Sequence, residues 1–148
     1  SEDFALLSLE ESIGSPLALA KMENPEKFKL TPVYAAGFPG IVIESDKKFI
    51  DLMGGDGSSI PDMVITNGTI SSSQKYLETI SAFIHSAQIS PGNSGGPLVN
   101  ECGQVLGINT FNVHDEDDSR NFSITSSEIL KYLKELNLDP NVAAGECK

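Results

Sequence analysis

The residues best suited to chemistry lie in the glycine-rich segment 91–99, Pro-Gly-Asn-Ser-Gly-Gly-Pro-Leu-Val. Ser94 supplies a hydroxyl that can attack a carbonyl carbon once a base removes its proton. Gly92 allows the backbone to turn so that its own N–H and that of Ser94 converge on one point. Two such donors form an oxyanion hole, and loss of one typically costs about 10²–10³ in rate. Gly95 and Gly96 keep the space beside the hydroxyl open for a substrate backbone. The alternative is a glycine turn without a chemical role.

Short apolar runs separated by turn signals surround this segment and predict strands. The dipeptide Asn67-Gly68 favours a tight turn or bulge between two of them, and residues 101–103 favour a hairpin. Strands at this spacing indicate an all-β fold, as a barrel or a sandwich. The predicted strands cover residues 4–9, 30–40, 63–66, 68–71, 80–87, 97–100, 104–110 and 121–125.

A good helical period is found near the C-terminus, where Ile129, Leu133 and Leu136 share one stripe. Ser126 or Ser127 can cap the start of this helix, which we expect over 126–137. Other segments are predicted to lack regular structure, as surface loops at 44–60 and 114–120 and as a mobile tail at 138–148.

Length and composition indicate one ordinary globular domain, with 148 residues, 39% hydrophobic and 21% charged. No unbroken apolar run approaches the roughly 18 residues of a membrane span. The net charge of −11 argues against binding to nucleic acid or to an anionic membrane. No cluster of cysteine and histidine indicates a metal site, and we expect no cofactor.

The nucleophile segment, together with residues 103–110, resembles the nucleophile strand and following hairpin of trypsin-like serine proteases, nearest to the HtrA/Deg branch. Residues 33–40 match the Val-x-Ala-x-Gly-Phe-Pro-Gly pattern of that branch. The resemblance runs in order over residues 2–136 and implies a trypsin-like β-barrel with a C-terminal α-helix. Further matches are the strand after the triad aspartate at 3–9, the Gly-x-Ile-Ser turn at 66–71 and the closing strand at 121–126.

The resemblance implies a division of the chain at three boundaries. Residues 1–12 would be the last strand of a first barrel and would carry the triad aspartate. Residues 13–125 would form the second barrel with the nucleophile, 126–137 the helix and 138–148 the tail.

Carried over from the family, Ser94 is the nucleophile, and the backbone amides of Gly92 and Ser94 form the oxyanion hole. Asp3 is the carboxylate that orients the catalytic histidine. The chemistry implied is hydrolysis of peptide bonds in a polypeptide substrate through an acyl-enzyme. No acidic residue stands at the base of the primary pocket, so it should accept small or medium aliphatic side chains rather than lysine or arginine. The pocket should be lined by Ile89, Ile108, Asn109 and Thr110.

The sequence departs from the family at the general base. The family's chain order is His, Asp, Ser, and only two residues precede Asp3 here. We therefore expect the histidine-bearing half to come from an N-terminal part of the same protein or from a second chain, and the present chain to be inactive alone. His85 and His114 occupy no family position for the base, and a strand histidine and a surface histidine are expected.

Other functions stay open beside an endopeptidase. The barrel could be a non-catalytic module that binds peptides or supports assembly, with Ser94 a relic. Ser1 could alternatively act as an N-terminal nucleophile. Because residues 4–9 form an apolar edge, we expect a bound partner half or homo-oligomers.

Cys102 and Cys147 are too few for a disulfide scaffold. One bridge between them would fasten the C-terminal tail to the hairpin at 101–103, and two reduced thiols are equally consistent. The compartment is left open, with a preference for the periplasm or for secretion.

Overall fold

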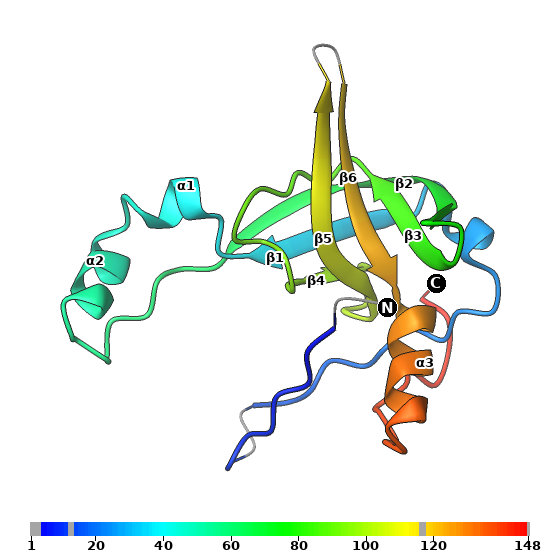
Figure 1. Cartoon of the computed structure of the whole chain (residues 1–148), viewed down its shortest axis with the longest axis horizontal. Helices are drawn as coiled ribbons and strands as arrows, with labels where there is room; N and C mark the ends of the chain where they lie inside the picture. The colour runs from blue at the N-terminus through cyan, green and yellow to red at the C-terminus, as the bar shows by residue number, and fades with distance from the viewer. Residues whose placement is uncertain (1–3, 12–13, 116–117, 148) are drawn as a thin grey trace.

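The strands of the computed structural model, which describes residues 4–11, 14–115 and 118–147, close into one barrel (Figure 1). Their order around the barrel is β1-β2-β3-β6-β5-β4, and neighbouring strands are antiparallel. The strands are β1 (Pro32–Gly37), β2 (Val64–Tyr76), β3 (Ile80–His85), β4 (Pro97–Val99), β5 (Val105–Asp115) and β6 (Asp118–Thr125). The helices are η1 (Pro25–Phe28), α1 (Gly40–Ile43), α2 (Lys47–Met53) and α3 (Ser126–Glu135). This confirms the predicted β-barrel with a C-terminal α-helix.

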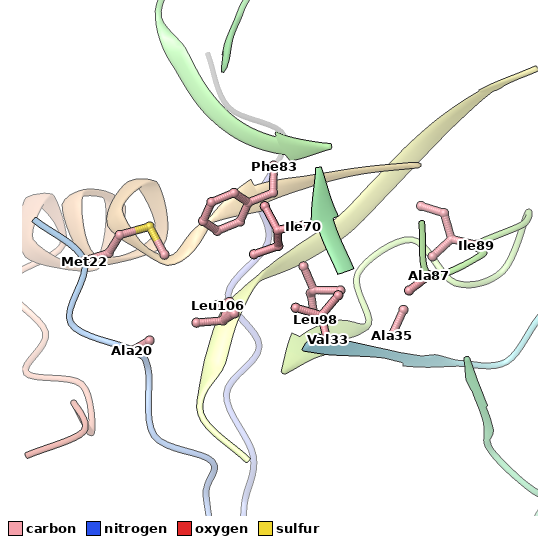
Figure 2. Close-up of a cluster of buried hydrophobic side chains, with 10 residues drawn as sticks. All are labelled: Ala20, Met22, Val33, Ala35, Ile70, Phe83, Ala87, Ile89, Leu98 and Leu106. Atoms are coloured by element: carbon pink, nitrogen blue, oxygen red, sulfur yellow. The ribbon is translucent and has the colours of Figure 1, made fainter. Parts of the chain in front are cut away.

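The apolar part of the core extends into the loop that precedes Ser94 (Figure 2). Strand residues supply most of it, because successive side chains of a strand point to opposite faces. Ala87 and Ile89 belong to the same cluster, so the start of the loop between β3 and β4 is held by core packing. The cluster comprises Ala20, Met22, Val33, Ala35, Ile70, Phe83, Ala87, Ile89, Leu98 and Leu106.

Helix α3 follows β6 without a break and packs against the barrel through the buried Ile129. Its N-cap residue is Thr125, which makes no side-chain capping bond. The predicted cap by Ser126 or Ser127 is wrong because both hydroxyls are used elsewhere. The Ser126 hydroxyl donates to the Ala20 carbonyl oxygen at 2.9 Å, and that of Ser127 lies 2.7 Å from the Thr125 hydroxyl.

The predicted turn at Asn67-Gly68 is wrong, since both residues lie within the continuous strand β2, opposite Tyr34 and Val33 of β1. Gly68 is needed there because a Cβ would overlap the Ala87 amide nitrogen. The glycine thus permits close packing of β2 against the loop after β3. The irregularity in β2 lies further on, between Ile70 and Ser72.

Two predicted loops contain regular structure. Within 44–60, α2 begins at a local cap, where the Asp46 side chain accepts hydrogen bonds from the Lys48 and Phe49 amides at 2.7 and 3.2 Å. Helix α2 has no buried residue, which is why apolar periodicity did not reveal it. Within 114–120, the strands β5 and β6 continue their pairing, with His114 opposite Ser119.

The segments at both ends of the chain pack against the barrel and α3. The Phe4 ring contacts that of Tyr132 in α3 with 5.4 Å between centroids, although residues 4–11 form no strand. Leu19 bonds to the backbone of Asn141 and Ala143 at 2.8 and 2.9 Å. These contacts attach part of the segment 138–148, whose composition predicts mobility. The boundaries at 1–12, 13–125, 126–137 and 138–148 stay predictions.

Cys102 and Cys147 form a disulfide with 5.8 Å between their Cα atoms. Of the two alternatives that the sequence leaves open, the structure has the bridge. Near it, the Gln104 side chain donates to the Gly145 carbonyl oxygen at 2.8 Å. In the part of the chain that is described, every helix is too short or too polar to cross a membrane.

Candidate active site

Ser94 lies on the loop between β3 and β4, and it is exposed. Its hydroxyl donates to the backbone carbonyl oxygen of Thr110 in β5 at 2.7 Å. The pairing of β4 with β5 brings these residues together, because Pro97 lies opposite Ile108. The loop before β4 therefore runs along the continuation of β5.

Gly92 gives the loop a conformation that other residues rarely adopt, with a φ of 100°. A Cβ at this position would overlap the Phe38 carbonyl oxygen and lie 3.0 Å from the Gly40 amide nitrogen. That amide donates to the Pro91 carbonyl oxygen at 2.9 Å. Since the C=O and N–H of a trans peptide point in opposite directions, the Gly92 N–H points away from Gly40.

The amides of Gly92 and Ser94 donate to no acceptor among the described residues, unlike their neighbours in the loop. Exposed unpaired N–H groups are available to an incoming oxygen atom. The neighbouring amides are engaged, with Asn93 donating to the Ser90 carbonyl oxygen at 2.9 Å, Gly95 to that of Asn109 at 2.9 Å and Gly96 to that of Asn93 at 3.0 Å.

The Asn93 side chain bonds back to an earlier residue of the same loop, Ser90. It is buried, and its Oδ1 accepts from the Ser90 amide and hydroxyl at 3.2 and 3.3 Å. The contact between Asn93 and Ser90 was not predicted from the sequence. The signal that could have found them is the spacing of three residues, at which an asparagine can bond back to the preceding backbone.

The trypsin-like peptidase domain family matches residues 1–108 of the chain. The chain belongs to this family. It is 36% identical to the serine protease Do-like HtrA of Bacillus subtilis over 91 residues, which are 58% of this chain and 20% of that protein. It is 36% identical to a probable periplasmic serine endoprotease DegP-like of Pseudomonas putida over 109 residues, which are 73% of this chain and 19% of that protein. The chain thus spans about a fifth of the length of these curated relatives.

The fold is also similar to that of a solved member, the serine endoprotease from Yersinia pestis, with a TM-score of 0.57 and 23% identity. The alignment covers 82% of this chain and 35% of that one. At this identity the likeness concerns the fold, and it agrees with the trypsin-like barrel that the sequence predicts.

The residues predicted to line the primary pocket of this trypsin-like domain differ in exposure. Ile108 and Thr110 are half-buried. Ile89 belongs to the apolar core, and Asn109 is fully buried with its side chain bonded inside the barrel. Of these four residues, Thr110 is the one whose backbone contacts Ser94, and Ile89 and Asn109 are buried.

The two histidines lie on strands, His85 on β3 and His114 on β5. His85 is buried in β3, and its Nε2 lies 2.9 Å from the Ser123 hydroxyl oxygen. Burial lowers the pKa of His85 to about 4, so its ring is neutral near pH 7. The backbone of His114 pairs with Ser119, about 13 Å along β5 from Thr110. Asp3 lies outside the described residues.

Within the described ranges, no group of three or more His, Cys, Asp and Glu side chains is arranged to hold a metal ion. The candidate site comprises the exposed Ser94 hydroxyl, the Thr110 carbonyl oxygen to which it donates, and the amides of Gly92 and Ser94, which donate to no acceptor among the described residues.

Proposed function

We propose that this chain carries the nucleophile-bearing part of an HtrA-type serine endopeptidase, with Ser94 as the attacking residue. The observation that carries the proposal is the exposed Ser94 hydroxyl on a loop whose only unengaged amides, among those of residues 92–96, are at Gly92 and Ser94. Membership of the trypsin-like peptidase family and the names of the relatives support the same reaction.

In the proposed reaction, Ser94 Oγ attacks the carbonyl carbon of a peptide bond while a histidine takes the hydroxyl proton. The amides of Gly92 and Ser94 stabilise the negative oxygen of the tetrahedral intermediate. The histidine then gives its proton to the leaving amine, and water hydrolyses the resulting acyl-enzyme by the reverse sequence. Asp3 would orient the histidine.

The proposed base is a histidine outside the printed sequence, supplied by an upstream part of a longer polypeptide or by a second chain. The buried position of His85 supports this, because its Nε2 is engaged by Ser123. A serine hydroxyl is a weak nucleophile at its free pKa, so we expect the chain alone to be inactive.

The proposed substrates are polypeptides with small or medium aliphatic residues before the cleaved bond. Ile108 and Thr110 would contact that side chain, while Ile89 and Asn109 would shape the pocket from behind. Cleavage mainly after lysine or arginine in a complete enzyme would contradict this assignment.

A serine-directed fluorophosphonate probe tests the proposal. The chain is mixed with the polypeptide that supplies the histidine, and labelling is located by mass spectrometry. We expect labelling at Ser94 that requires both parts and is abolished in Ser94→Ala. Absence of labelling in a folded, reconstituted protein would favour the second candidate, a non-catalytic binding module, which is supported by the burial of His85 inside the barrel.

A further inference from the structure

A row of polar side chains crosses the interior of the barrel at three adjacent strands. His85 of β3, Ser123 of β6 and Asn109 of β5 have exposed fractions of 1%, 0% and 0%. The Ser123 hydroxyl oxygen lies 2.9 Å from His85 Nε2 and 2.9 Å from Asn109 Oδ1. Burial of polar groups is costly unless they are hydrogen-bonded, so each link of the row stabilises the others.

The direction of the hydrogen bonds in this row is fixed by the number of protons. Ser123 has one hydroxyl proton and donates it to Asn109 Oδ1. His85 Nε2 must therefore carry a proton and donate it to the Ser123 oxygen. The ring is then the neutral tautomer with its lone pair on Nδ1, which is buried without a hydrogen-bond partner among the described residues.

Asn109 connects this row of polar side chains to the loop that carries Ser94. Its amide donates to the Gly96 carbonyl oxygen at 2.8 Å, and its carbonyl oxygen accepts from the Gly95 amide at 2.9 Å. Its side-chain Nδ2 donates to the carbonyl oxygens of Pro97 at 3.2 Å and Ala36 at 3.4 Å. A reversed side-chain amide would place Oδ1 against these carbonyls, so donation from Ser123 favours the orientation in which Asn109 joins β5 to β4 and β1 beside the loop.

A second link holds the other end of the same loop. Asn121 of β6 donates from Nδ2 to the His85 carbonyl oxygen at 3.2 Å and accepts from the Ile89 amide at 3.1 Å. The Ser94 loop is therefore bonded to the side chain of Asn121 in β6 at one end and to the backbone of Asn109 in β5 at the other. The residue that follows Asn109 is Thr110, whose carbonyl holds the Ser94 hydroxyl.

We propose that His85, Ser123 and Asn109 form a positioning network that fixes the Ser94 loop in a single orientation. Its importance for catalysis rests on the proposed function, but the effect on the loop does not. His85 thus acts as a neutral hydrogen-bond donor from within the barrel and not as the base for Ser94.

Backbone hydrogen exchange of the chain, followed by NMR, tests the network without requiring activity. In Ser123→Ala, the amides of Gly95 and Asn109 should exchange about tenfold faster or more, relative to amides of β2. The matched control is Ser126→Ala, which removes another fully buried hydroxyl whose bond to Ala20 lies outside the loop. Equal local exchange in the two variants, compared at equal global stability, would overturn the proposal.

The histidine is tested by ¹⁵N chemical shifts in the unmodified chain, so that no variant needs to fold. We expect a protonated Nε2 and an unprotonated Nδ1, and the opposite tautomer would contradict the network. In His85→Gln, whose side-chain amide can donate to Ser123, the amides of the loop should exchange as slowly as in the unmodified chain. In His85→Leu, which has no donor, they should exchange faster. Fast exchange in both variants would count against a donor role.

In a reconstituted enzyme, Ser123→Ala should slow fluorophosphonate labelling of Ser94 about tenfold with little change in KM for peptides, since a misplaced nucleophile lowers kcat. Ser126→Ala should label normally. If no variant labels because the proposed function is wrong, the exchange result still decides whether the network positions the loop.

Discussion

The Ser94 hydroxyl donates its proton to the Thr110 carbonyl oxygen, with 2.7 Å between the two oxygens. In the proposed reaction, the base that activates Ser94 would therefore compete with this carbonyl for the proton. Thr110 follows Asn109, whose backbone bonds to Gly95 and Gly96, the two residues after Ser94. The candidate site is thus assembled by the pairing of β4 with β5 and by buried polar contacts.

Gly92→Ala should disrupt the loop and destabilise the protein. An added Cβ would overlap the Phe38 carbonyl oxygen, and a φ of 100° is unfavourable for alanine. We expect a loss of about 2–4 kcal/mol in the free energy of unfolding, from strain and overlap together. Labelling of Ser94 in a reconstituted enzyme should fall at least about a hundredfold, because one of the two proposed oxyanion donors is displaced.

Gly95→Ala is the control for this prediction. Gly95 also has a positive φ, 86°, but a Cβ there would meet no atom within 4 Å. Urea unfolding should show a loss of only about 1 kcal/mol, the cost of the backbone conformation alone. Equal losses in the two variants would mean that the contact with Phe38 has no role.

Much of the barrel could be predicted from the sequence because its strands bury alternating apolar residues. The segment around Val33 and Ala35 is such a case, and so is the helix with Ile129 on its buried side. Helix α2 could not be predicted in this way, since its start depends on the side chain of Asp46 and none of its residues is buried. The continuity of β2 through Asn67-Gly68 depends on packing against Ala87, which local turn preferences do not contain.

For the candidate site, residue types and spacing led to Ser94 and Gly92, while the side chains behind the loop were missed. Asn109, which was predicted to line a pocket, is buried, and its backbone also bonds to Gly95 and Gly96 of the loop. Its position relative to Ser123 and His85 depends on which strands are neighbours in the barrel. That order, with β6 between β3 and β5, is a property of the closed sheet and not of local sequence.

Stability should depend on pH through His85. Burial lowers its pKa from 6.5 to about 4, and a backbone contact with Ala87 acts in the opposite direction, although Nδ1 makes no hydrogen bond of standard geometry among the described residues. Between about pH 4 and 6.5 the unfolded chain binds more protons at this residue, so the folded state gains stability as the pH rises. The contribution is complete above pH 6.5 and amounts to at most about 3 kcal/mol.

Carboxylates titrate in part of the same range, so the test compares the chain with His85→Gln. Urea unfolding at pH 4 to 8 should give a stability difference that changes through this window and is constant above pH 7. A difference that does not vary with pH would show that His85 has an ordinary pKa in the folded chain.

Reduction of the disulfide should destabilise the protein. The bridge joins residues 45 positions apart, and closing a loop of this size stabilises the folded state by about 4 kcal/mol in the chain-entropy model. Urea unfolding with and without a reductant measures the loss. The Cys102→Ser, Cys147→Ser double variant should match the reduced protein and should not respond to the reductant.

The reduced protein should retain the site, since the bridge joins the tail to the β4–β5 hairpin and not to the Ser94 loop. Labelling of Ser94 in a reconstituted enzyme should therefore be unchanged below the unfolding transition. Loss of labelling at full folding would reveal a coupling between Cys147 and the loop that no described contact explains.

Glu128 should stabilise the junction between α3 and β3. Its side chain is buried, and Oε1 accepts a hydrogen bond from the Ser81 amide at 2.9 Å. Glu128→Ala leaves that buried amide unsatisfied and should cost about 1–3 kcal/mol in the free energy of unfolding. Glu128→Gln keeps an acceptor and should cost less. Lys75, whose Nζ lies 3.8 Å from Oε1, is 59% exposed, so Lys75→Met should change the stability by under about 1 kcal/mol.

Urea unfolding of these variants, beside Glu135→Gln at the exposed end of the same helix, separates the amide bond from the ion pair. If Lys75→Met costs as much as Glu128→Ala, the charge attraction rather than the bond to Ser81 stabilises the junction. If Glu128→Gln and Glu128→Ala are equivalent, the Ser81 amide finds another acceptor when the carboxylate is removed, and the hydrogen bond contributes little.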